Sequence, residues 1–204
     1  MEHTAKNLPE IIGNWQNIYE DFWANFEKCF HYKTTRYHAE RYVRGLLARM
    51  ERKNGWQMAG YLGDKTPHAI QNFLSRAAWD DEKVRDKLIN YAKKLLLSDD
   101  EKGVLIVDET GFLKKGIHSV GVARQYTGTA GRIENSQVGV FLTLAGSKGH
   151  MLVDCALYLS KAWCEDRNRR EKAHIPDTVT FKTKPQLAQK MLERAFSQGI
   201  TAIS

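Results

Sequence analysis

The sequence predicts an α+β fold, with a helical first half and a second half that contains strands. Up to about residue 100, apolar residues recur at spacings of three and four, which is typical of amphipathic helices. After Gly103 they gather in short continuous runs, which is typical of buried strands. The polar segment 99–101 lies where the periodicity changes. We therefore expect a helical region in residues 1–100 and a second domain in residues 101–204.

The composition of the 204 residues is that of a globular protein, because 42% are hydrophobic and 27% are charged. No apolar run approaches the ~20 residues of a membrane helix, and the N-terminus lacks the apolar core of a signal peptide. Three cysteines without a CxxC pair argue against a disulfide framework and a zinc knuckle. We expect a cytoplasmic protein, and its net charge of +7 suits a polyanionic partner.

The first expected helix carries one apolar stripe that we interpret as core, and Pro9 suits its first turn because proline lacks an N–H. The stripe consists of Leu8, Ile11, Ile12, Trp15, Ile18, Tyr19, Phe22, Trp23, Phe26 and Phe30. A second helix is expected to begin after Thr34 or Thr35 and to stop at Asn54-Gly55. Its inward-facing residues would be Val43, Leu46, Leu47 and Met50.

Two short helices around a tight turn are expected next. Residues 56–62 form the first, residues 63–65 the turn, and Thr66-Pro67 opens a second helix that runs to about Ala78. This order is that of a helix-turn-helix motif, although an ordinary corner of a helical bundle has the same spacing. Asp80 is expected to cap a further helix.

The sequence of the second half predicts three strands and a helix. Residues 104–107 read as a strand buried on both faces, and residues 137–145 and 150–159 read as two strands joined by a hairpin. Lys184-Pro185 opens a helix that ends at Gly199, and residues 200–204 look like the start of another strand.

Basic residues gather in two segments. Residues 28–53 hold eight lysines and arginines against two acids, and residues 114–132 hold four with no acid. Either segment can be an ordinary solvated surface, but two such clusters on either side of Asp108 favour phosphate contacts. The DNA-binding candidates are Arg41, Arg44, Arg49, Arg52, Lys65, Gln71, Asn72, Arg76, Lys114, Lys115, Arg124 and Gln125. For Arg124 and Gln125 a hairpin held by side-chain hydrogen bonds is the alternative.

Asp108 is the candidate catalytic and metal-binding residue. It ends the apolar run 104–107, and a carboxylate at the end of a central strand projects into the crevice where open α/β sheets place their chemistry. Mg²⁺ prefers one or two carboxylates together with phosphate oxygens and water. The alternative is an acid that only caps the next turn.

Residues 104–116, which include Asp108-Glu109-Thr110-Gly111, form a distinctive segment that is followed by residues 119–128, 134–140 and 157–159 and by Trp163. Together these segments resemble bacterial insertion-sequence transposases of the DDE superfamily, in the group named after insertion sequence seven-oh-one. Residues 104–116 resemble the segment with the first catalytic aspartate, and the similarity spans roughly residues 32–200.

The resemblance implies an RNase H-like catalytic domain preceded by a helical DNA-binding region, and cleavage and strand transfer at transposon ends. Three carboxylates would hold two Mg²⁺ or Mn²⁺ ions, with Asp108 as the first carboxylate. The second is expected just after the strand that follows the helix at 186–198, and the third much further on, so the domain would be incomplete here. We therefore expect this chain to bind double-stranded DNA at the terminal repeats without cutting it, near the bacterial nucleoid, as a homodimer or paired with full-length transposase.

Two other functions remain open at this stage. One is a non-catalytic regulator or a remnant derived from a transposase. The other is a nuclease complete within these residues, in which Asp108 would act together with Asp154.

Overall fold

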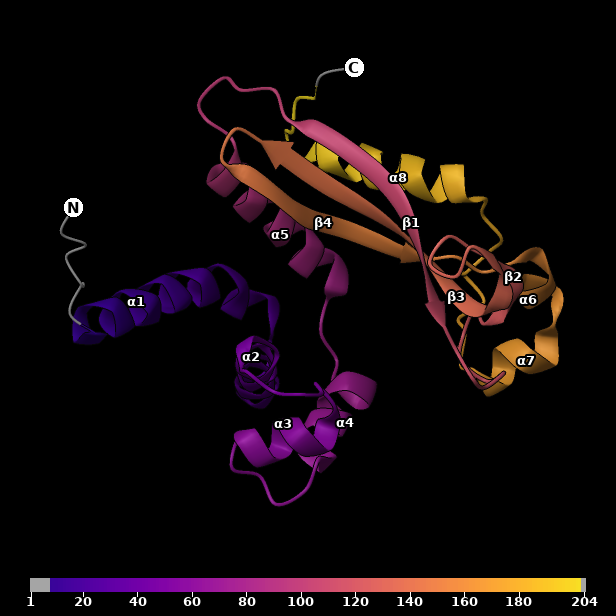
Figure 1. Cartoon of the computed structure of the whole chain (residues 1–204), viewed down its shortest axis with the longest axis horizontal. Helices are drawn as coiled ribbons and strands as arrows, with labels where there is room; N and C mark the ends of the chain where they lie inside the picture. Colours follow the sequence, from indigo (N-terminus) through magenta and orange to yellow (C-terminus); the bar gives the residue numbers. More distant parts are fainter. Residues whose placement is uncertain (1–7, 203–204) are drawn as a thin grey trace. The chain divides into compact units, whose positions relative to one another are not determined.

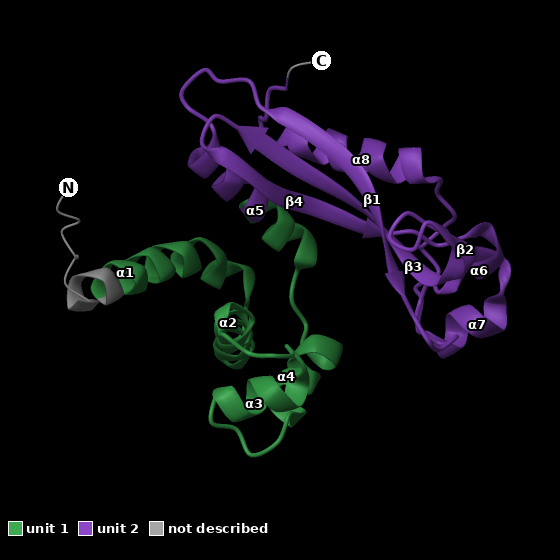
Figure 2. Ribbon diagram, viewed as in Figure 1, with its two compact units in different colours: residues 1–87 green, residues 88–204 purple. Residues whose placement is uncertain are grey.

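A computed structural model describes the backbone of residues 8–202 and the side chains of residues 13–202. The chain divides into two compact units, Met1–Lys87 and Leu88–Ser204 (Figure 2). The division lies inside one helix, α5 (Asp81–Leu96), and not near residue 100 where the periodicity changes. The reason is that the second half of this helix contributes its apolar residues to the core of the second unit.

Unit 1 consists of helices (Figure 1). They are α1 (Leu8–Phe26), the short 3₁₀ helix η1 (Glu27–Cys29), α2 (Lys33–Leu47), α3 (Gly55–Tyr61), α4 (His68–Arg76) and the beginning of α5. Its core is formed by Cys29, Phe30, Ala39 and Phe73. Phe30 contacts the rings of Trp23 and Phe73, so the turn after α1 is held by aromatic packing.

The expected core of unit 1 is wrong in two places. Trp15 and Ile18 on α1 are 68% and 50% exposed, because the buried aromatic residues lie at the end of this helix. Leu8, Ile11 and Ile12 are outside the described side chains. The second helix ends at Leu47 instead of Asn54, so Leu46 and Leu47 lie at its exposed end and do not face inward.

The turn between α3 and α4 is built by local signals. Asn54 caps α3 by accepting a hydrogen bond from the N–H of Gln57, and Gly63 takes a positive φ of 79° where the helix ends. The N–H of Asp64 then donates to the carbonyl of Ala59, which closes the helix end. Two short helices joined by a glycine turn are thus present as expected.

Unit 2 contains a four-stranded antiparallel sheet. Its strands are β1 (Val104–Leu113), β2 (Ala123–Thr127), β3 (Arg132–Gly146) and β4 (Gly149–Leu157). The long strand β3 pairs with all three others. Ala145 of β3 lies opposite Val104 of β1, and Gly146 of β3 lies opposite Gly149 of β4 at the hairpin. Strand β2 was not expected from the sequence. It pairs with residues 132–136 of β3, which precede the expected strand 137–145.

The core of unit 2 lies on one face of this sheet. Val140, Leu142 and Leu144 of β3 are buried among apolar residues of α5 and α8 (Lys184–Ser197). The opposite face carries apolar side chains, such as Ile106 and Phe112 of β1, that are 47% and 46% exposed. The expectation that residues 104–107 are buried on both faces is therefore wrong, because no other described element covers this face or the outer edge of most of β1.

The remaining elements follow β4. Two short helices, α6 (Lys161–Glu165) and α7 (Arg167–Lys172), were not predicted, whereas α8 begins and ends as expected. After Gly199, Ala202 forms a parallel bridge with Gly103, and the N–H of Gly103 donates to the carbonyl of Thr201 at 2.8 Å. Within the described part of the chain, no helix is both long and apolar enough to cross a lipid bilayer.

Candidate functional site

Asp108 lies in the middle of β1 rather than at its end, because the strand continues to Leu113. It stands opposite Phe141 of β3. Its side chain is exposed, and its Oδ1 accepts a hydrogen bond from the N–H of Glu109 at 2.8 Å. Among the described residues no cation forms an ion pair with Asp108. It therefore presents an exposed carboxylate that can accept a cation.

The neighbouring acid, Glu109, has a different environment. Successive residues of a strand point to opposite faces, so Glu109 shares a face with Val140 and α8. There it forms an ion pair with Lys184, whose ammonium also lies 5.5 Å from the centre of the Tyr158 ring. The charge of Glu109 is thus compensated within the protein, and that of Asp108 is not.

Lys184 is placed by the start of α8. The preceding Thr183 forms a capping box with Gln186, and Ala188 and Met191 are buried beneath the helix. A pocket of about 250 Å³ lies between this helix start and β1. It is lined by Val107, Asp108, Glu109, Val140, Lys184, Pro185 and Ala188.

Gly111 allows β2 to approach β1 just beyond Asp108. A Cβ atom at Gly111 would lie 1.7 Å from Oγ1 of Thr127, which is 2% exposed. The hydroxyl of Thr129 also donates to the Gly111 carbonyl at 2.9 Å. The glycine in the Asp108–Gly111 segment is therefore required by packing, and it fixes the part of β1 that carries Asp108.

The described residues do not by themselves form a metal site. They contain no group of three His, Cys, Asp or Glu side chains placed to hold one ion. Asp154, the other candidate, is opposite Leu142, whereas Asp108 is opposite Phe141, so the two carboxylates point to opposite faces of the sheet. Asp154 is buried and forms an ion pair with Arg194 at 3.5 Å. The pairing of Asp108 with Asp154 around one ion does not fit this geometry.

In unit 1, Arg41 is used internally. Its guanidinium donates to the Tyr37 hydroxyl at 2.7 Å and to the Leu62 carbonyl at 2.8 Å, and it forms an ion pair with Asp64 at 2.9 Å. Burial lowers the pKa of Arg41, but the hydrogen bond to Tyr37 and the charge of Asp64 outweigh this, so the pKa is raised overall. This geometry favours a structural role, which ties α2 to the turn after α3.

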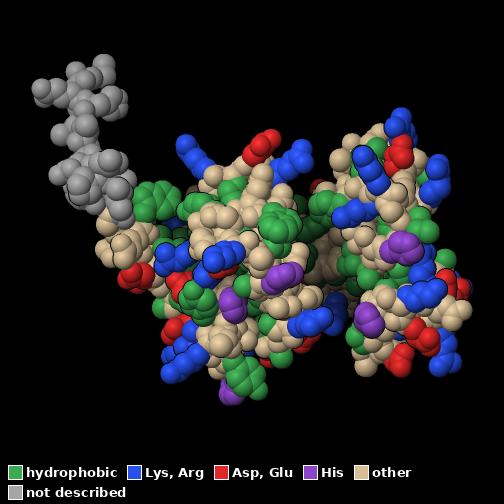
Figure 3. Space-filling model, turned by 90° about the horizontal axis from the view of Figure 1, so that it is seen from below, with side chains coloured by type: hydrophobic (Ala, Val, Ile, Leu, Met, Phe, Trp, Pro, Cys, Tyr) green, Lys and Arg blue, Asp and Glu red, His purple; other side chains and the backbone are tan. Residues whose placement is uncertain are grey.

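The other basic candidates of unit 1 are more accessible. Arg44 bonds to Glu40 at 2.8 Å and lies over the ring of Tyr19 at 4.7 Å, with half of its side chain exposed. Arg49, Arg52, Lys65, Gln71, Asn72 and Arg76 are exposed. On the face drawn in Figure 3, the basic side chains of each unit are interspersed with hydrophobic and acidic ones.

In unit 2, Lys114, Lys115 and Arg124 are exposed. The loop after β1 is held by Asn135, whose side-chain amide donates to the carbonyls of Lys114 and Gly116 at 2.7 and 2.9 Å. The side-chain amide of Gln125 donates to the Ser136 carbonyl at 2.8 Å. This bond corresponds to the alternative interpretation of Gln125, in which its side chain holds the hairpin. The two lysines and Arg124 remain available for a ligand.

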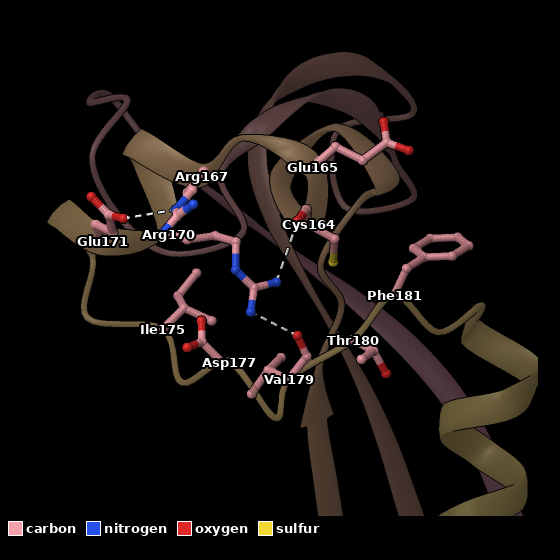
Figure 4. A pocket seen from close by; sticks show the side chains of 10 residues that line it. All are labelled: Cys164, Glu165, Arg167, Arg170, Glu171, Ile175, Asp177, Val179, Thr180 and Phe181. Atoms are coloured by element: carbon pink, nitrogen blue, oxygen red, sulfur yellow. Dashed lines mark hydrogen bonds and ion pairs between the residues drawn. The ribbon is translucent and has the colours of Figure 1, made fainter.

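A second pocket, of about 600 Å³, lies against α6 and α7 (Figure 4). Arg170 donates to the carbonyls of Cys164 and Val179 within it, at 3.3 and 2.9 Å. Next to it Arg169 stacks on the buried ring of Trp163 at 3.7 Å. Arg170 thus holds the loop 173–183, and Arg169 holds the segment before β2 through the carbonyls of Ile117 and Val122, so both have a structural role.

Sequence reasoning missed Glu109, Lys184 and Gly111 as parts of the site. Lys184 was noticed only as the start of a helix, and its ion pair with Glu109 depends on how α8 packs on the sheet. The sequence does show that Glu109 follows Asp108. Because side chains alternate between the two faces of a strand, it could also have been predicted that the two carboxylates lie on opposite faces.

Comparisons with known proteins show the family of the chain. Residues 25–204 match the family described as DDE superfamily endonuclease. The chain is 30% identical over 158 residues to the probable transposase for insertion sequence element IS701 of Microchaete diplosiphon. That match covers 76% of this chain but only 37% of the length of the transposase. No solved structure matches the chain. The chain therefore belongs to the DDE superfamily of endonucleases, and a relative that it matches is a probable insertion-sequence transposase.

Proposed function

We propose that the chain is the DNA-binding region and the first part of the catalytic domain of an insertion-sequence transposase. The observation that carries the proposal is the exposed carboxylate of Asp108 on β1, beside a Glu109 that Lys184 already neutralises. In this proposal Asp108 contributes one carboxylate to the site where DNA phosphodiesters are cleaved.

An RNase H-like domain is the fold we propose for unit 2. The antiparallel strands β1, β3 and β4 form the main part of the sheet, the short β2 lies between β1 and β3 in the sequence, and α8 follows after α6 and α7. The chain then returns beside β1 in the parallel direction at Ala202. A helix that leads into a parallel strand of the same sheet is the usual crossover connection, and it brings the following residues next to the strand of Asp108.

The divalent ion, when bound, would supply an activated water and stabilise the leaving oxygen. In this proposal the chain contributes only the Asp108 carboxylate to the metal site, because the described residues contain no group of three metal ligands. We therefore expect the chain to hold DNA without cutting it.

DNA binding is assigned to the exposed basic side chains of unit 1, with α4 as the helix for the major groove through Gln71, Asn72 and Arg76. Arg49 and Arg52 would contact phosphates. Arg44 would do so by giving up its ion pair with Glu40. Arg41 would stabilise this region from within. In unit 2, Lys114, Lys115 and Arg124 would contact phosphates near Asp108. The partners would be transposon terminal repeats and a second transposase copy, near the nucleoid.

The test is binding and nicking of a labelled duplex that carries the insertion-sequence end. We expect an apparent affinity that falls steeply with salt, and no nicking in Mg²⁺ or Mn²⁺. Specific nicking that Asp108→Ala abolishes would contradict the expected inactivity. Failure to bind duplex DNA even at low salt would contradict the DNA-binding function.

A regulatory function is the second candidate, favoured by the lack of a group of three metal ligands among the described residues. A regulator of this kind would occupy transposon ends or pair with the complete enzyme. Adding the chain to a transposition assay distinguishes the two cases, because a regulator lowers the yield in a concentration-dependent way and an inert remnant does not.

A further inference from the structure

Trp56 is 67% exposed on the first turn of α3, although an indole is one of the largest apolar side chains. A single exposed apolar side chain does not by itself mark a binding site, so its surroundings have to be compared. Trp15 on α1 is 68% exposed and provides a comparison within the same unit. The two tryptophans differ in their surroundings.

The loop before Trp56 is fixed by hydrogen bonds at both ends. The N–H of Arg52 donates to Oε1 of Gln57 at 2.7 Å, and the N–H of Gln57 donates to Oδ1 of Asn54 at 3.0 Å. The ammonium of Lys53 donates to the carbonyl of Ala48 at 3.1 Å and to that of Leu46, at the end of α2. The loop 48–54 is therefore held between α2 and α3, next to Trp56.

This loop carries basic side chains that are not neutralised. Arg49 and Arg52 are exposed, and the described residues include no acid that pairs with them. Glu51 is the single acid of residues 48–57. By contrast, α1 contains no lysine or arginine, and Glu20 and Asp21 follow Trp15. Trp56 thus lies in a positively charged segment, and Trp15 lies in a negatively charged one.

The start of α3 also lies directly against α4. A Cβ atom at Gly55 would be 3.2 Å from Cβ of Pro67 and 3.9 Å from Cγ and Nε2 of Gln71. The residue before Trp56 therefore lies next to Gln71, one of the α4 residues that we assign to the major groove. The loop 48–54, Trp56 and Gln71 form one continuous part of unit 1.

We propose that Trp56 is a DNA contact of this chain, packing its indole against sugars and bases of a duplex while Arg49 and Arg52 hold the neighbouring phosphates. The inference rests on the proposed DNA-binding function and adds an apolar contact to it. Apolar side chains can pack on the sugars of a duplex or wedge against its bases, and because an indole is uncharged it neutralises no phosphate and releases no counterion. Arginine contacts with phosphates release counterions, so their contribution falls with salt.

The experiment measures the anisotropy of a labelled duplex that carries the insertion-sequence end, with the complete chain, at several salt concentrations. We expect Trp56→Ala to weaken binding by about fivefold or more with an unchanged salt slope. Trp56→Phe should retain most of the affinity, because it keeps an aromatic ring. The double change Arg49→Gln with Arg52→Gln should lower the slope by roughly 0.9 for each phosphate that an arginine no longer neutralises.

Trp15→Ala is the matched control, since it removes an equally exposed indole, and it should bind as the unchanged chain does. Circular dichroism checks that each variant is folded. Unchanged binding by Trp56→Ala, or an equal loss for both tryptophans, would overturn the assignment of Trp56 while leaving DNA binding intact. If the unchanged chain fails to bind duplex DNA, the proposed function fails, and the inference fails with it.

Discussion

Arg194 of α8 forms an ion pair with the buried carboxylate of Asp154 on β4, with 3.5 Å between Nε and Oδ2. The Asp154 side chain is only 2% exposed, and its Oδ1 also accepts the N–H of Cys155 at 2.8 Å. This pair joins α8 to the sheet. Asp154 is thus used within the fold and does not fit as the partner of Asp108 at a metal ion, whereas Asp108, in the middle of β1, is exposed and has no ion pair among the described residues.

Removing Arg194 should destabilise unit 2. In Arg194→Met the buried Asp154 loses a charged partner, and breaking such a pair typically costs about 3–5 kcal/mol. Urea unfolding measures the change. Arg167→Met is the control, because its ion pair with Glu171 is 91% and 64% exposed and should contribute less than about 1 kcal/mol. Equal effects of the two substitutions would contradict the structural role of Asp154.

Gly111→Ala should destabilise the sheet beside Asp108. The added Cβ would collide with Oγ1 of Thr127, and overpacking of this kind costs about 1–3 kcal/mol or more. Gly116→Ala, in the loop just after β1, is the matched control, because no atom lies within 4 Å of the Cβ it adds. Its free energy of unfolding should change by no more than about 0.5 kcal/mol. A tolerated Gly111→Ala would mean that β2 does not approach β1 as described.

Glu101 should make stability depend on acid pH. Its carboxylate accepts the N–H of Ser98 at 2.8 Å and both the N–H and the hydroxyl of Ser147 at 2.6 and 2.7 Å. These bonds, that of the Ser98 backbone first, lower the pKa of Glu101 from 4.5 to about 2. Because the pKa is lower in the folded state, the stabilisation is complete above pH 4.5 and is lost as the pH falls toward 2.

Unfolding measured between pH 5 and 2 tests this dependence. Glu101→Gln should flatten the fall in stability over this range. An identical pH profile for Glu101→Gln and the unchanged chain would show that the Ser98 and Ser147 bonds do not favour the ionised carboxylate.

Local signals explain the parts of the fold that the sequence predicted. The cap at Thr183 and the glycine at 199 define α8, and Asp80 caps α5 by accepting the N–H of Lys83 at 2.9 Å. These features depend on residues a few positions apart. They are therefore readable without knowledge of the packing.

The failures concern contacts between distant segments. Residues 104–107 are apolar in the manner of a fully buried strand, yet Val104 and Ile106 are 45% and 47% exposed because no described element covers that face. Strand β2 has no alternating pattern of its own and exists by pairing with β3. Periodicity within one segment carries no information about either arrangement.

The candidate site shows the same division. Asp108 was predicted as a site residue from the family resemblance and from a place at the end of a strand, although β1 continues past it to Leu113. Its surroundings were not, since Lys184 lies 76 positions away along the chain and Thr127 reaches Gly111 only through the sheet. Arg41 was assigned to DNA by charge alone, and its bonds to Leu62 and Asp64 could not be read from spacing.

The most direct test of Asp108 as a metal-binding carboxylate is paramagnetic broadening by Mn²⁺, which replaces Mg²⁺ as a probe. Amide signals of the ¹⁵N-labelled chain are followed while Mn²⁺ is added in the presence of duplex DNA. We expect broadening centred on residues 107–110, lost in Asp108→Asn and retained in Asp177→Asn, which removes an exposed carboxylate elsewhere in unit 2. Broadening centred on other acids, or unchanged by Asp108→Asn, would contradict the assignment.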